Sequence, residues 1–219
     1  MKEFKIRCSA IGKIMTNARS KTETLSKTTK TYLEEWSKEQ IYNRKKEVFS
    51  KYIDKGNAVE VESLNFIAKE LNYNSLVKND ESFENGFLTG TPDAILDDHI
   101  IDVKNSWDCF SFPLYFSSVP NKDYYWQAQG YMALTDIDRY KLIYTLMDTP
   151  EDLIQREFFG DESTDLVSFA NKYKYSDIES KYRIKVFEIY RNEEDIRKIY
   201  NRVEECRSYL KSLWVDLNF

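Results

Sequence analysis

The segment GTPDAILDDHIIDVK, residues 90–104, constrains the fold more than any other part of the sequence. Two short apolar runs flank an Asp-Asp pair, a pattern that is typical of a tight turn between two strands. We therefore expect a β-hairpin with Asp93 at the start of its first strand and Asp102 within its second. Because side chains alternate along a strand, Asp102 and Lys104 should face one side and Val103 the other.

The rest of the chain alternates between helical and strand-like patterns. A short helix should follow Ser9 as its N-cap, and further helices should cover residues 31–49, 58–71 after Gly56, 123–135, and 193–213 after Asn192. Strands are expected at FLTG (87–90), YKLIYTLMD (140–148) and YRIKVFEIYR (182–191). This alternation predicts an α/β protein with a mixed central β-sheet flanked by helices. We expect a single domain over residues 1–219, in which the polar stretch 149–181 is an insertion.

Composition excludes several kinds of catalysis. His99 is the only histidine, and Cys8, Cys109 and Cys206 lie far apart, so histidine-based triads and clustered zinc or iron–sulfur sites are largely ruled out. No apolar stretch is long enough to span a membrane. The net charge is −5, but residues 1–50 carry +6 and the remainder −11. The basic N-terminal region is either an anion-binding face or an ordinary solvated helical surface.

The carboxylates of the hairpin suggest a metal site. An ionised carboxylate among apolar residues has to be paired, exposed or bound to a cation, because its burial alone is costly. Asp93 and Asp102 on adjacent strands, with Lys104 beside them, suit Mg²⁺ and a water molecule that the lysine orients. The alternative is a pair of aspartates near a turn and a surface lysine, since such short patterns recur by chance.

Two further polar side chains lie where apolar ones are expected. Glu60 shares its helical face with Leu64 and Ile67, so it is either one partner of a buried salt bridge or another group of the metal site. Gln127 shares its face with Tyr131, and the pair could hold a phosphate or simply pack in the core.

In chain order, these residues resemble the PD-(D/E)XK nuclease superfamily. Its signature is E … PD … (D/E)xK … QxxxY, and the matching segments here are GNAVE (56–60), TPD (91–93), IDVK (101–104) and QAQGY (127–131). Within the superfamily, the chain is most similar to the lambda-exonuclease / YqaJ-like viral recombinase family. The similarity includes the N-terminal segment RCSAIGKI and the C-terminal strand and helix, and leaves out residues 149–181.

The resemblance implies a restriction-endonuclease-like core and a role for each matched position. Asp93, Asp102, the backbone carbonyl of Val103 and Glu60 would bind the metal. Lys104 would orient or activate the attacking water, and Gln127 and Tyr131 would lie near the scissile phosphate. The groups expected to hold a terminal 5′-phosphate are Ser9, Thr91, Arg7, Lys5 and Lys2. Close relatives often have glutamate at the position of Asp102, so the shorter side chain has to approach the ion more closely.

The resemblance also implies an activity, cofactors and partners. We expect a 5′–3′ exonuclease that resects linear double-stranded DNA from a free 5′ end in phage-type homologous recombination. Two Mg²⁺ ions, replaceable by Mn²⁺, would be its cofactors, because the ligands are oxygens. Its partners would be a single-strand annealing recombinase and further copies of the chain in a ring. We expect it in the cytoplasm of a bacterial or phage-infected cell, without a membrane partner.

Two other functions are compatible with the same residues. One is an endonuclease of the same superfamily, of restriction or repair type. The other is a non-catalytic relative that binds DNA or protein and only keeps the fold. The presence of all the expected acids and of the lysine favours an enzyme, because a degenerate relative would usually have lost one.

Overall fold

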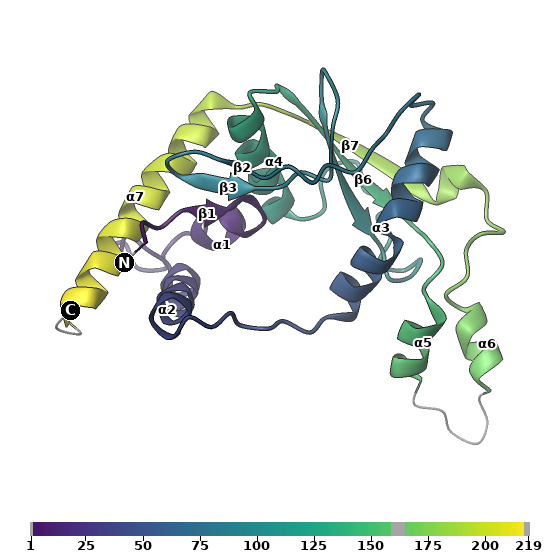
Figure 1. Ribbon diagram of the computed structural model, residues 1–219, viewed down its shortest axis with the longest axis horizontal. Coiled ribbons are helices and arrows are strands. Elements are labelled where there is room, and N and C mark those ends of the chain that lie inside the picture. The colour runs from purple at the N-terminus through teal and green to yellow at the C-terminus, as the bar shows by residue number, and fades with distance from the viewer. Residues whose placement is uncertain (1, 159–164, 217–219) are drawn as a thin grey trace.

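The computed structural model describes residues 2–158 and 165–216, and its centre is a four-stranded mixed sheet (Figure 1). The strand order is β4-β5-β6-β7. β5 runs antiparallel to β4 and parallel to β6, and β6 in turn runs antiparallel to β7. The four strands are β4 (Ala94–Ile95), β5 (Ile100–Asn105), β6 (Arg139–Thr145) and β7 (Ile184–Tyr190). The predicted α/β class with a mixed sheet is therefore confirmed.

A second, smaller sheet brings the N-terminus beside the hairpin. It has the order β1-β3-β2, with β1 (Ile6–Arg7) parallel to β3 (Leu88–Gly90) and β2 (Phe83–Glu84) antiparallel to it. β3 ends at Gly90, three residues before Asp93. The small sheet thus places the segment that follows β1 next to the start of the β4–β5 hairpin.

Helices cover both faces of the four-stranded sheet. Leu64 and Ile67 of α3 pack on Ile101, Val103 and Ile143, whereas Ala128 and Met132 of α4 belong to the larger core with Ile100 and Tyr140. The helices are α1 (Ile11–Ile14), α2 (Lys27–Tyr42), α3 (Lys51–Glu70), α4 (Lys122–Thr135), α5 (Glu151–Glu157), α6 (Leu166–Asn171) and α7 (Glu193–Asp216), with short 3₁₀ turns at Cys8–Ala10 and Ser180–Tyr182. None of the described helices is both long and apolar enough to cross a membrane.

The register of β5 decides which side chains face which helix. Ile101 and Val103 point to α3, and so Asp102 points to α4, into the larger core. The alternation expected from the sequence is therefore present, and it leaves one carboxylate on an otherwise apolar face.

Three local predictions were wrong. The helix expected over residues 31–49 is α2, which starts at Lys27 because the Ser26 hydroxyl accepts a hydrogen bond from the Thr29 N–H, and which ends where Asn43 adopts a left-handed conformation. Ser9 does not cap α1 through its side chain but lies inside the 3₁₀ turn that precedes it. Gly56 does not precede a helix, because α3 continues through it.

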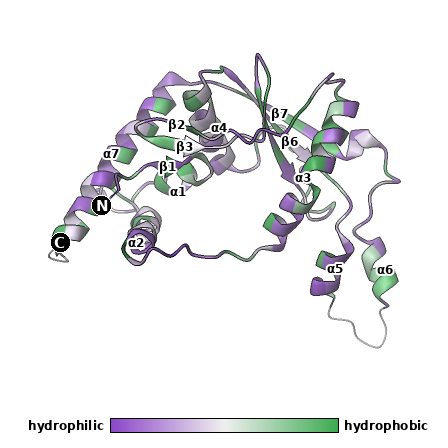
Figure 2. Ribbon diagram, viewed as in Figure 1, coloured by the Kyte–Doolittle hydropathy of each residue, from purple (hydrophilic) through white to green (hydrophobic). Residues whose placement is uncertain are grey.

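The C-terminal elements agree with the prediction. β7 leads into α7, and the Asn192 side chain caps this helix by accepting hydrogen bonds from the N–H groups of Glu194 and Asp195. The apolar positions Ile196, Ile199, Val203 and Leu210 are all buried. Figure 2 shows the resulting mixture of hydrophilic and hydrophobic ribbon along α7, as expected for a helix with one face against a core.

Most of the polar stretch 149–181 lies away from the central sheet. It contains α5 and α6, which extend together from one end of the molecule (Figure 1). Residues 159–164 of this stretch lie outside the described residues. Its interpretation as an insertion in a single domain stays a prediction.

Substitution by alanine should have opposite effects on stability at two helical glycines. A Cβ atom on Gly130 of α4 would overlap Ile11 Cδ1 and lie 3.0 Å from Cys8 Sγ, whereas a Cβ atom on Gly56 of α3 would meet nothing within 4 Å. Gly130→Ala should lower the free energy of unfolding by about 1–3 kcal/mol through overpacking. Gly56→Ala should raise it by about 0.5–1 kcal/mol, because alanine is the better helix former. Urea denaturation measures both, and equal shifts in the same direction would contradict this packing.

Candidate active site

The β4–β5 hairpin places two aspartates opposite each other. Ala94 pairs with Ile101, so Asp93 and Asp102 are the next residues on either side of the ladder. The Asp93 carboxylate accepts a hydrogen bond from the Val103 N–H at 2.7 Å, through Oδ2. Asp93 is partly buried and Asp102 almost completely so. The hairpin that the sequence predicts therefore brings the two acids together.

Asp102 is held by two side chains on the α4 side of the sheet. Its side chain is 1% exposed, and the Lys104 ammonium lies 2.6 Å from Oδ2. Gln127 Nε2 of α4 donates a hydrogen bond to Oδ1 at 2.9 Å. Gln127 is itself buried, so it fixes the orientation of the aspartate rather than reaching into solvent. Lys104 Nζ also lies 4.9 Å from the centre of the Tyr124 ring.

Glu60 enters the site from α3. Its Oε2 accepts a hydrogen bond from Lys78 Nζ at 2.6 Å, and its side chain is 22% exposed. The Glu60 carboxylate is therefore compensated by a salt bridge. This is the simpler of the two explanations that the sequence left open for a glutamate on an apolar helix face. The salt bridge is only half-buried, however, and Glu60 also lines the cavity that contains the hairpin acids.

One cavity of about 750 Å³ joins these groups. Glu60, Asp93, Val103 and Lys104 line it together with Ser9. Asp102 lies behind the wall of the cavity and contacts it through Lys104. Side chains from α3, from both strands of the hairpin and from the N-terminal segment therefore meet at one place.

The cavity concentrates negative charge. Burial, and then the neighbouring Asp102 carboxylate, raise the pKa of Asp93 to about 7. Burial alone would lower the pKa of Lys104, but Asp102 and Asp93 outweigh that effect and raise it. Lys104 is consequently an ammonium ion at neutral pH, and the two aspartates still carry more negative charge than it neutralises.

The donor set fits a hard divalent cation. In the described part of the chain, no three His, Cys, Asp or Glu side chains form a metal-binding arrangement. Asp102 is instead paired with Lys104, and Glu60 with Lys78. Asp102 Oδ2 nevertheless accepts no hydrogen bond of good geometry, and only the Lys104 charge compensates it. Carboxylate oxygens with excess negative charge are the ligands that Mg²⁺ prefers. A cation here would replace the two lysines as counter-charge.

The residues expected to hold a phosphate group fall into two hollows. Arg7, Ser9 and Thr91 line one of about 290 Å³, together with Tyr131, whose hydroxyl donates a hydrogen bond to the Thr91 carbonyl at 3.1 Å. Ser9 lines both this hollow and the acidic cavity, so the two are neighbours. Lys2 and Lys5 instead line a separate groove of about 380 Å³ that also includes Arg7. Lys5 is paired there with Glu84 at 3.4 Å.

Lys55 supports the cavity wall and was not predicted from the sequence. It is fully buried in α3, and its ammonium donates hydrogen bonds to the carbonyls of Ser106, Trp107 and Met147 at 2.7, 3.0 and 2.7 Å. Burial lowers its pKa to about 8. Nothing in the sequence marked Lys55, because lysine on a helix is ordinarily a surface residue.

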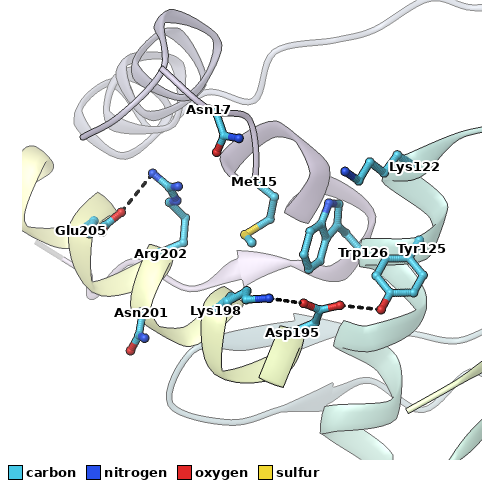
Figure 3. Close-up of a pocket in the computed structure, with 10 residues that line it drawn as sticks. All are labelled: Met15, Asn17, Lys122, Tyr125, Trp126, Asp195, Lys198, Asn201, Arg202 and Glu205. Carbon is cyan, nitrogen blue, oxygen red and sulfur yellow. Dashed lines mark hydrogen bonds and ion pairs between the residues drawn. The ribbon is translucent and has the colours of Figure 1, made fainter. Parts of the chain in front are cut away.

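Another hollow of about 500 Å³ lies between α4 and α7 (Figure 3). Its charged groups are largely paired with one another. Asp195 accepts hydrogen bonds from Lys198 and from the Tyr125 hydroxyl, and Arg202 pairs with Glu205. None of the residues matched to the nuclease signature lines this hollow.

Comparison with known proteins supports this assignment through structure. No protein-family model matches the sequence, and no curated protein is significantly similar to it. A phage-related exonuclease from Haemophilus somnus 129PT is similar, with a TM-score of 0.81 and 29% identity over 99% of this chain and 97% of that one. An alkaline exonuclease from Laribacter hongkongensis, LHK-Exo, has the same fold at 14% identity, with a TM-score of 0.67 over 98% of this chain and 91% of that one. Its complex with dAMP gives a TM-score of 0.65 over 97% and 91% of the two chains.

The exonuclease neighbours agree with the ordered motifs and with the restriction-endonuclease-like core. The predicted resemblance to the PD-(D/E)XK nuclease superfamily, and within it to lambda-exonuclease-like proteins, is therefore confirmed by the phage-related exonuclease.

Proposed function

We propose that this nuclease is a Mg²⁺-dependent 5′–3′ exonuclease that resects linear double-stranded DNA by hydrolysing its phosphodiester bonds. The observation that carries the proposal is the acidic cavity in which Glu60, Asp93 and Lys104 meet, with Asp102 directly behind them. Its neighbour, the hollow at Ser9 and Thr91, offers a place for the end of a strand.

Each side chain has a distinct role in this proposal. Asp93, Asp102, Glu60 and the Val103 carbonyl are the candidate ligands of two divalent ions. The bound ions would supply positive charge for the scissile phosphate and lower the pKa of the attacking water. Lys104 stays protonated, so it would orient the water and a phosphate oxygen rather than remove a proton. Gln127 acts through Asp102, whose carboxylate it holds in place.

The hollow at the N-terminus would select the end of the substrate. Arg7 provides a charge and Ser9 and Thr91 provide hydroxyl groups, which together suit a 5′-phosphate. Tyr131 closes the hollow beside Thr91. Because Ser9 also lines the acidic cavity, a strand anchored here would present its first linkages to the carboxylates. Lys2 and Lys5 would contact the backbone from the adjoining groove.

A biological context completes the proposal. One structural neighbour is described as phage-related, which supports a role in phage-type homologous recombination. We propose a single-strand annealing recombinase as partner, a homo-oligomeric ring as the assembly, and the cytoplasm of a bacterial or phage-infected cell as the location.

Substitution of the carboxylate or the lysine tests the chemistry. Asp102→Asn and Lys104→Ala should each reduce Mg²⁺-dependent digestion of linear duplex DNA more than about 100-fold, because both remove charge from the reacting centre. Asp97→Asn is the matched control, since it makes the same change on the exposed turn of the same hairpin. Circular dichroism checks folding. Full activity in a folded Asp102→Asn or Lys104→Ala variant would remove the assignment.

The choice of DNA end tests the polarity and separates the alternatives. We expect linear duplex with a 5′-phosphate to be digested faster than duplex with a 5′-hydroxyl, because only the former fills the hollow at Arg7 and Ser9. Closed circular plasmid should stay intact. Nicking of the circle would favour the endonuclease, and metal-independent duplex binding without any digestion would favour the non-catalytic relative.

Ionisation of Asp93 should change the stability of the protein with pH when no metal is bound. The Asp93 pKa of about 7 in the folded protein lies above the ordinary value of 3.8, so the folded protein binds more protons than the unfolded chain between these pH values. Stability in EDTA should therefore fall as the pH rises through this window. Asp93→Asn removes this loss of stability. The free energy of unfolding of Asp93→Asn, measured by urea denaturation, should therefore exceed that of wild type by more at pH 8 than at pH 5. The same advantage at both pH values would contradict the assignment.

Mg²⁺ provides the matching control for that measurement. At pH 8 it should raise the stability of the wild-type protein by binding the folded state, and raise that of Asp93→Asn much less. An equal increase in the two proteins would argue against a metal site at Asp93.

A further inference from the structure

Asn105 is a polar side chain of the cavity that the matched motifs do not include. It is the last residue of β5 and follows Lys104 directly, and it lines the same cavity as Glu60 and Asp93. Its neighbours on the other side are two hydroxyl groups, Ser63 of α3 and Thr145 of β6, both completely buried. One end of the Asn105 amide therefore faces the buried hydroxyl groups, and the other end faces the acidic cavity.

The hydroxyl groups fix which end of the amide faces inward. Thr145 Oγ1 donates a hydrogen bond to Asn105 Oδ1 at 2.6 Å, and its other polar neighbour, Ser63 Oγ, is farther away at 3.4 Å. Ser63 Oγ also lies 2.6 Å from Asn105 Oδ1, and 2.8 Å from the Val59 carbonyl. Ser63 can donate its single proton to either acceptor, whereas Thr145 has no nearer acceptor than Asn105 Oδ1. The carbonyl end of the amide therefore faces the interior.

The amino end is left for the cavity. Among residues 2–158 and 165–216, Asn105 Nδ2 donates no hydrogen bond. It is also not one of the buried polar atoms that lack a partner, so it is in contact with solvent, and Asn105 lines the cavity. Two N–H donors thus open into the space where the carboxylates and Lys104 meet.

The backbone around this amide is unusually well supported. Asn105 and Thr145 are paired across the parallel β5–β6 ladder, and the Ser106 N–H donates a hydrogen bond to the Thr145 carbonyl at 3.0 Å. Lys55 then binds the carbonyls of Ser106 and Trp107. The donor is consequently presented by a rigid strand end rather than by a loop, which favours accurate positioning of a ligand.

We propose that Asn105 Nδ2 binds a non-bridging oxygen of the phosphate that enters the cavity, as a substrate-positioning contact of the proposed nuclease. This assignment rests on the proposed function. A neutral donor suits the location, because it can hold the phosphate without pairing with the acidic groups as a lysine would. Ser63 and Thr145 are positioning residues that keep the amide in the required orientation.

Two variants that differ by one side chain test the contact. The control is Ser63→Ala with Thr145→Val, which removes the inner hydroxyls but keeps the amide. The test variant adds Asn105→Leu, a side chain of similar size without donors. Because the hydroxyls are absent from both, the leucine leaves no buried polar partner unsatisfied. Thermal denaturation checks that both variants fold.

Binding is measured in EDTA by fluorescence anisotropy with 5′-phosphorylated duplex DNA, so that no cleavage takes place. Relative to this control, the addition of Asn105→Leu should weaken binding about tenfold, equivalent to one hydrogen bond of about 1.4 kcal/mol. The slope of log affinity against log salt should be the same for both variants, because no charge is removed. Equal affinity of the two folded variants would overturn the assignment, as would a changed slope.

A modified substrate localises the contact. The same duplex with a methylphosphonate at its first 5′ linkage lacks one of the non-bridging oxygens. On the diastereomer that lacks the contacted oxygen the two variants should bind alike, and an undiminished tenfold difference on both diastereomers would overturn the assignment. If the wild-type protein digests duplex DNA and Asn105→Leu does not change binding, only the role of Asn105 is wrong. If the wild-type protein neither binds nor digests duplex DNA, the proposed function is wrong as well.

Discussion

The site depends on one carboxylate that the fold places among apolar side chains. The register of β5 turns Ile101 and Val103 toward α3, and this leaves Asp102 facing the core beneath α4. A buried charge without a partner would cost several kcal/mol, and loss of one partner of a buried pair typically costs about 3–5 kcal/mol. Lys104 and Gln127 meet this requirement. Those two partners also make Asp102 suitable as a ligand, since its orientation is fixed before any ion binds.

The surrounding elements build the site outward from this residue. The hairpin sets Asp93 beside Asp102, and the Val103 N–H anchors it. α3 contributes Glu60 at the surface and Lys55 in the interior, so that one helix provides both a candidate ligand and the support of the cavity wall. The small sheet brings Ser9 and Arg7 to the hairpin although they lie more than eighty residues away in the sequence. The adjacency of the hollow at Ser9 and Thr91 to the acidic cavity supports our proposal of an enzyme that works from a strand end.

The sequence predicted those parts of the structure that follow from local periodicity. The hairpin, the Asn192 cap and the apolar face of α7 were correct, because turn residues, caps and spacing are local signals. The predicted start of α2 was wrong, because the prediction did not use Ser26, which caps the helix. The place of Asp93, Asp102, Lys104 and Glu60 near one cavity agrees with expectation, whereas their roles stay predictions. Lys55, the pairing of Glu60 with Lys78 and the Ser63–Asn105–Thr145 contacts were not predictable, because each joins segments that only the tertiary fold brings together.

The central claim is that the cavity exists to hold a divalent cation between the hairpin aspartates. Crystals grown with Mn²⁺ and measured at a wavelength where manganese scatters anomalously test it most directly. We expect an anomalous peak bonded to the carboxylates of Asp93 and Asp102, with Lys104 moved away from Asp102. A map without such a peak, in which the Lys104–Asp102 and Lys78–Glu60 pairs persist at high Mn²⁺ concentration, would contradict it.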